Sequence, residues 1–345
     1  RGSYQVRAAY SSCAGALKER FGKLCPLRST VQIPGESPDG GCRQAFACRL
    51  VDSAMSADDG SDKYPEESGR RRFVKGVVGG ATLVGVGGVG VAGVNSATSS
   101  SGAGGGTTQS WAIENTGGPA PRGMPMIPIE VDDSGNLRGV WPEVQEVNQG
   151  GLTVQIAETE NYKGSGTTYT QEWFQYCGVE SYTGLQPTYE SDNLFRVSSN
   201  PAYSWQGEAY EEGDPLNIDD FGDYETWNNE FGTPQWKPAT ATWRSQGAES
   251  TIPVQVIRSK TVERLVSGEG EISDAARSWL QAATDQGVVA WLNKCTHFCC
   301  VPGWKQTADA AKFGDADEVY CQCHQSLYDP FSVVQTLFTA RPRPQ

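Results

Sequence analysis

Two histidines and five of the ten cysteines gather near the C-terminal end of this 345-residue chain. They form two short motifs, Cys295-x-His297 and Cys321-x-x-His324, with 23 residues between His297 and Cys321. Each motif can point one thiolate and one imidazole from a single tight loop toward a common centre. Such a set suits a [2Fe–2S] cluster with two sulfurs on one iron and two imidazoles on the other, or a tetrahedral zinc ion.

Further cysteines in both motifs argue against a plain zinc site. Cys300 and Cys323 lie beside the four candidate ligands, and Ser326, Tyr328 and Asp329 follow the second motif. The two segments resemble the cluster-binding boxes of the Rieske iron–sulfur proteins of cytochrome bc-type complexes, which read C-T-H-x-G-C and C-P-C-H-G-S-x-Y-D. The close match covers residues 295–329.

The resemblance implies a role for each matched residue. Cys295 and Cys321 would bind one iron of a [2Fe–2S] cluster, and His297 and His324 the other. His324 would face the quinol site as the catalytic residue. Cys300 and Cys323 would form a disulfide that joins the two loops over the cluster. The Ser326 hydroxyl would hydrogen-bond to a bridging sulfide of the cluster, and the Tyr328 hydroxyl to a ligand sulfur.

Three departures from the family pattern bear on loop geometry. Cys299 and Gln325 stand where the family has glycine, Gln322 stands where it has proline, and the spacer is longer. If Cys300 pairs with Cys323, then Cys177 and Cys299 are left over. They either form a second disulfide or remain separate thiols, with Cys177 buried as a small apolar side chain.

The implied fold is all-β, a Rieske-type antiparallel β-sandwich with a small cluster-binding subdomain, preceded by one N-terminal transmembrane helix. Alternating apolar residues predict strands around 152–156 and 252–256. Residues 287–292 predict a buried strand leading to Cys295. Residues 274–284 form the only convincing helical pattern, with Ser273 as its candidate cap. We therefore expect an acidic β-rich region of unknown role over 111–236 and a cluster-binding domain over 237–345.

The segment before residue 111 has the layout of an exported, membrane-anchored protein. Residues 55–72 end in an arginine cluster, and Arg70-Arg71-Arg72-Phe73-Val74-Lys75 resembles the twin-arginine export signal. Residues 73–94 are apolar and long enough for one transmembrane helix, although eight of them are glycine. Residues 95–110 are rich in Ser, Gly and Thr and predict a flexible linker.

Composition separates the basic N-terminus from an acidic body. Residues 1–54 carry a net positive charge within a chain of net charge −13, and they read as a leader that is not native, with Met55 as the natural start. The acidic body is typical of a halophilic prokaryote, because dense carboxylates keep a surface hydrated at high salt; an ordinary acidic secreted domain is the alternative. Nucleic acid is not an expected partner.

By resemblance, the expected function is that of a membrane-anchored electron-transfer subunit that oxidises quinol. Its partners would be a cytochrome b-type membrane subunit and a downstream cytochrome or copper protein. It would lie in the cell membrane as a single-pass protein, with its N-terminus cytoplasmic and its head outside. The alternative is the Rieske subunit of an arsenite-oxidase-type molybdenum enzyme. A ring-hydroxylating oxygenase is excluded for this chain alone, because that class needs two more histidines.

Overall fold

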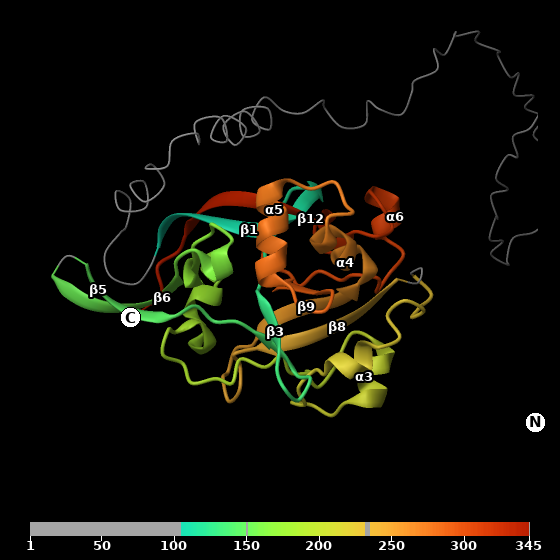
Figure 1. Ribbon diagram of the computed structural model, residues 1–345, viewed down its shortest axis with the longest axis horizontal. Helices are drawn as coiled ribbons and strands as arrows, with labels where there is room; N and C mark the ends of the chain where they lie inside the picture. Colours follow the sequence, from blue (N-terminus) through green and yellow to red (C-terminus); the bar gives the residue numbers. More distant parts are fainter. Residues whose placement is uncertain (1–104, 150, 232–234, 345) are drawn as a thin grey trace, which may run out of the picture. The chain divides into compact units, whose positions relative to one another are not determined.

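The computed structural model describes residues 105–149, 151–231 and 235–344, which are mostly β-strands with few helices (Figure 1). Every pairing between their named strands is antiparallel. This agrees with the all-β expectation. None of the described helices is both long and apolar enough for a membrane span. The leader, the export signal and the transmembrane helix expected over 73–94 lie outside the described residues.

The largest sheet has four strands in the order β11-β12-β1-β2. Its strands are β1 (Gly106–Gly117), β2 (Met124–Pro125), β11 (Val319–Cys321) and β12 (Ser326–Ala340). β1 and β12 pair from Gly106 opposite Ala340 to Gly117 opposite Leu327, with two irregularities (Figure 1). The linker expected to reach Ser110 therefore ends earlier, because residues 106–110 already form part of this ladder.

A second sheet, of order β10-β9-β8, carries the chain into the first motif. Its strands are β8 (Trp236–Trp243), β9 (Ile252–Ser259) and β10 (Val288–Leu292). The predicted alternation at Ile252, Val254 and Val256 lies in β9, where all three are buried. All five residues of β10 are buried, as expected of a short, continuously apolar strand.

Two smaller sheets complete the β-structure. One pairs β3 (Ile129–Val131) with β4 (Leu137–Gly139), and the other has the order β5-β6-β7. The strands of the latter are β5 (Val144–Gln149), β6 (Leu152–Thr159) and β7 (Tyr169–Thr170). The strand predicted around 152–156 is β6.

Helices are short and lie between the strands. The predicted helix is α5 (Asp274–Ala283), and the Ser273 side chain caps it by accepting a hydrogen bond from the Ala276 N–H. A helix that we did not predict, α4 (Lys260–Ser267), follows β9 directly and is capped by Ser259. Its eight residues bury only Val262 and Leu265, too few for a clear helical period. The remaining helices are α3 (Ser204–Ala209), α6 (Ala310–Phe313), η2 (Tyr162–Gly164), η3 (Gln171–Phe174), η4 (Val179–Ser181), η5 (Thr183–Leu185) and η6 (Ile218–Phe221).

One hydrophobic core joins the region 111–236 to the residues that follow it. Trp111 stacks on Trp279 of α5 with ring centroids 6.3 Å apart, and Trp173 lies 5.1 Å from the same ring. The expected boundary at 236/237 falls at the start of β8, and buried residues from both sides belong to one cluster. The aromatic residues of 111–236 therefore help to build the body that carries both motifs.

Candidate metal centre

The first motif lies in a loop that hydrogen-bonds to itself. This first loop, residues 293–302, follows β10. The Cys295 N–H donates to the Cys300 carbonyl at 2.8 Å, and the Cys299 N–H donates to the Cys295 carbonyl at 3.0 Å. At its base, Asn293 Nδ2 donates to the Pro302 carbonyl at 2.9 Å. These bonds fix the direction of the short stretch that carries Cys295 and His297.

The second motif lies in the hairpin between β11 and β12. In this second loop, residues 321–326, the Gln325 N–H donates to the Cys321 carbonyl at 2.8 Å, and Cys321 pairs with Ser326. Cys299 and Gln325, the two positions where the Rieske boxes quoted above have glycine, both adopt left-handed backbone angles, with φ of 66° and 62°. The loops thus keep a conformation that glycine favours, although side chains are present there.

The two loops place the two predicted cysteine ligands beside each other and the two predicted histidine ligands beside each other. Cys295 and Cys321 are buried and are the free cysteines of the described chain. Their thiols hydrogen-bond to each other, and the backbone N–H groups of His297 and of His324 point to the sulfurs of Cys295 and Cys321 respectively. The imidazole rings of His297 and His324 lie 4.8 Å apart, centroid to centroid. His324 is exposed and His297 is half-buried, so the thiols lie inside and the imidazoles outside.

The hydrogen bond between the two thiols also sets their acidity. It lowers the pKa of Cys295 to about 5, while it raises the pKa of Cys321, because the pair favours one negative charge on the Cys295 sulfur. Hydrogen bonds from Tyr328, from the His297 N–H and from Ser326 lower the pKa of Cys295 further. A thiolate is the form of cysteine that binds metal, so Cys295 is prepared to act as a ligand.

Hydroxyl groups behind the ligands complete the site. Tyr328 Oη donates to Cys295 Sγ at 3.1 Å and accepts from the Thr296 N–H at 3.2 Å. The Ser326 side chain is fully buried, and its Oγ has no nitrogen or oxygen partner among the described residues, although it lies close enough to the Cys295 sulfur to lower the pKa of that thiol. His297 Nδ1 is likewise buried and without a partner there. Two buried polar atoms beside two buried thiols are what a bound inorganic group would satisfy.

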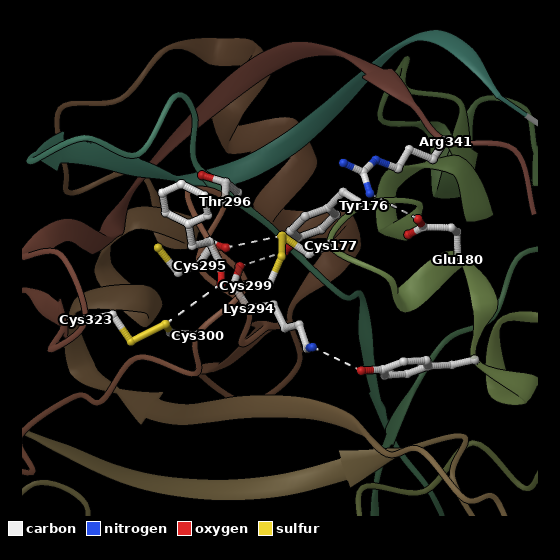
Figure 2. Close-up of a disulfide and its surroundings, with 12 residues drawn as sticks. Tyr176, Cys177, Glu180, Lys294, Cys295, Thr296, Cys299, Cys300, Cys323 and Arg341 are labelled. Atoms are coloured by element: carbon white, nitrogen blue, oxygen red, sulfur yellow. Dashed lines mark hydrogen bonds and ion pairs between the residues drawn. A yellow bond between two sulfur atoms is a disulfide. The ribbon is translucent and has the colours of Figure 1, made fainter.

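Two disulfides border the site. Cys300 pairs with Cys323, as the resemblance implied, and this bond joins the first loop to the second. Cys177 pairs with Cys299, so the first of the two alternatives for these residues is the one in the structure (Figure 2). The sulfurs of Cys300, Cys321 and Cys323 lie within 4.8 Å of one another, but two of them form a disulfide and cannot act as thiolate ligands.

Several supporting residues come from parts of the chain that the sequence did not connect with the site. Thr296 Oγ1 donates to the Arg122 carbonyl at 2.6 Å, and the Arg122 guanidinium stacks on the rings of Phe338 and Tyr176 at 3.6 and 4.4 Å. Burial among these rings lowers the pKa of Arg122. No local pattern marks Arg122 or Tyr176, because their hydrogen bonds with the first loop are made across more than a hundred residues.

Searches of protein-family models, of curated proteins and of solved structures gave no match to this chain. Two thiols, two imidazoles and a hydroxyl on a ligand sulfur are the side chains that a [2Fe–2S] group with mixed cysteine and histidine ligation needs.

Proposed function

We propose that this chain is a Rieske-type iron–sulfur subunit that takes electrons from quinol and passes them to a downstream carrier. In this proposal the β-sheets form a Rieske-type sandwich, and the first and second loops form its cluster-binding subdomain. Cys295, Cys321, His297 and His324 would hold the [2Fe–2S] cluster. The observation that carries the proposal is the grouping of the ligands, with the two thiols buried, the two imidazole rings 4.8 Å apart on the outer side, and the Tyr328 hydroxyl donating to Cys295 Sγ.

That observation favours an iron–sulfur cluster over zinc. A single tetrahedral zinc ion binds all four ligand atoms around one centre. A [2Fe–2S] group takes both thiolates on one iron and both imidazoles on the other. Thiols grouped on the inside and imidazoles grouped on the outside match this second division of the ligands.

The arrangement of the ligands supports electron exchange at the imidazole end. When bound, a [2Fe–2S] cluster with two imidazole ligands accepts one electron at a higher potential than an all-cysteine cluster. The buried thiols keep water from the sulfur side, whereas His324 is exposed and can meet a quinol hydroxyl. Phe298 and Val301, with exposed fractions of 66% and 58%, give the same end an apolar rim suited to a membrane-embedded donor site.

Metal analysis and spectroscopy test this function directly. The purified holoprotein should contain two irons and two acid-labile sulfides per chain and no stoichiometric zinc, and its reduced form should give a low-temperature EPR signal of a Rieske centre. Cys321→Ser and His324→Ala should each abolish the signal. Gln322→Ser, an exposed neighbour in the same loop, is the matched control and should keep it. Stoichiometric zinc, or an unchanged cluster in His324→Ala, would show that the ligand assignment is wrong.

A further inference from the structure

A compact segment of short helical turns lies against the first loop. This segment, residues 171–185, contains η3, η4 and η5, and we call it the collar. Tyr176 Oη donates to the Lys294 carbonyl at 2.9 Å, and Lys294 Nζ donates to the Tyr182 hydroxyl at 3.0 Å. Between them, the disulfide Cys177–Cys299 ties the collar covalently to the loop (Figure 2). Two hydrogen bonds and one disulfide thus join the collar to the first loop.

The collar is itself held by the largest sheet. The Arg341 N–H donates to the Gln175 carbonyl at 2.9 Å, and the Arg341 guanidinium lies 3.5 Å from a Glu180 carboxylate oxygen. Trp173 and Phe174 are fully buried in the core. Anything bonded to the collar is therefore bonded to a fixed part of the body.

The first loop is held by disulfides from two directions. Cys299 binds the collar while its neighbour Cys300 binds Cys323 of the second loop. Cys177 and Cys299 both adopt left-handed backbone angles, with φ of 55° and 66°. Residues other than glycine disfavour these angles. Cysteine at position 299 has a backbone cost that glycine would not have. The bond that the cysteine forms is the feature that glycine cannot supply.

We propose that Cys177–Cys299 is a second clamp on the cluster-binding site, which holds Cys295 and His297 in place from the side opposite to Cys300–Cys323. This inference rests on the proposed function. Cys177 and Cys299 are positioning residues. The Cys177 sulfur lies 3.5 Å from the Cys295 carbonyl, so the clamp touches the residue that supplies a ligand. Without it the first loop stays bonded to the second through Cys300–Cys323 but is free to move relative to the collar, which varies the position of Cys295 and His297.

The test compares three variants with the wild-type holoprotein. Cys177→Ser/Cys299→Ser removes the clamp, and Cys177→Ala/Cys299→Gly removes it while relieving the backbone angle at 299. Ser181→Ala, an exposed collar residue that bonds only within the collar, is the control. At a temperature where far-UV circular dichroism is unchanged, EDTA should bleach the cluster about tenfold faster in both clamp variants, the size typical of losing support for a metal ligand. Their EPR lines should broaden, and Ser181→Ala should match the wild type.

Three results would overturn the clamp. One is a wild-type protein in which non-reducing peptide mapping finds Cys177 and Cys299 both free to react with iodoacetamide. Another is a clamp variant with a lower unfolding temperature but unchanged bleaching rate and EPR line shape, since the bond would then support only the fold. The third result does not depend on the cluster. Hydrogen exchange at the backbone amides of residues 295 and 299 should be faster in the clamp variants, and unchanged exchange would contradict the clamp. A wild-type protein without iron would count against the proposed function alone.

Discussion

The hydroxyl groups of Tyr328 and Ser326 distinguish this site from a plain pair of cysteine motifs. Tyr328 reaches Cys295 Sγ from a strand that is buried at that point, and burial raises the pKa of its hydroxyl, so the group stays a neutral donor. Ser326 lies at the first residue of the same strand, opposite Cys321 in the ladder. A hydrogen bond to a sulfur is stronger when that sulfur carries more negative charge. Both hydroxyls should therefore stabilise the reduced cluster more than the oxidised one.

Removing either hydroxyl should lower the midpoint potential. At about 1–2 kcal/mol for each charge-assisted hydrogen bond, Tyr328→Phe and Ser326→Ala should each shift it down by tens of millivolts. Redox titration followed by EPR measures the shift. Tyr320→Phe is the control. Tyr320 precedes Cys321 in the sequence, but its ring stacks on Phe313. A raised or unchanged potential in both test variants would mean that these hydroxyls do not bind the sulfurs of the cluster.

At the scale of the elements, the second loop depends on how closely β1 approaches it. Gly118 follows β1 with a φ of 75°, and a Cβ atom there would lie 2.4 Å from the Gln325 carbonyl oxygen. That distance is a clash with backbone, which cannot move without shifting the loop that carries Cys321 and His324. The end of β1 thus sets the position of the second loop, much as the collar sets that of the first.

Gly118→Ala should destabilise the fold and disturb the second loop. The left-handed angle alone costs about 1–2 kcal/mol, and the overlap with Gln325 should bring the total to roughly 3 kcal/mol or more. Gly213→Ala separates the two causes, because Gly213 has a similar φ of 89° and open space around its Cβ position. Urea unfolding should show the larger loss for Gly118→Ala. Equal losses would mean that the close approach has no energetic weight.

The sequence predicted those parts of the molecule that local spacing determines. The patterns of β9, β10 and α5 repeat over a few residues, whereas the Cys300–Cys323 pair was implied by the family that the two motifs resemble, and the ligand set remains a prediction. The collar could not be predicted, because Tyr176 and Tyr182 have no periodicity and meet Lys294 only in the folded chain. Cys177 and Cys299 could be noticed as surplus cysteines, but nothing in the sequence decided whether they pair.

At the scale of the whole molecule, the proposed function requires a head that can travel. In a quinol-oxidising complex the cluster must meet a donor near the membrane and then an acceptor farther away, and electron transfer slows steeply with distance. Because β1 begins at Gly106, and the Gly105 N–H donates to Glu172 of the collar at 3.0 Å, what is left of the expected linker is residues 95–104, which lie outside the described residues. The Ser- and Gly-rich composition of that part predicts a flexible coil.

A stiffer linker should reduce quinol oxidation without affecting the binding of the cluster. Replacing residues 97–104 with a proline-rich segment of equal length should leave iron content and potential unchanged and sharply reduce quinol oxidation in membranes. A Gly/Ser replacement of the same length is the control and should retain activity. Full turnover with the stiff segment would favour the alternative, a small subunit fixed against a molybdenum partner.

The two disulfides also determine what a cut in the backbone can do. Cys177–Cys299 spans 122 residues of sequence and Cys300–Cys323 spans 23, and the two bonds begin at adjacent residues. Residues 177–299 therefore form one covalent ring and residues 300–323 a second, and the peptide bond between Cys299 and Cys300 joins the two rings. A single proteolytic nick inside either ring, for example in the exposed turn at 211–213, leaves every piece attached to the rest. The strands that support the two loops thus remain one molecule after damage that would release a fragment from a chain without these rings.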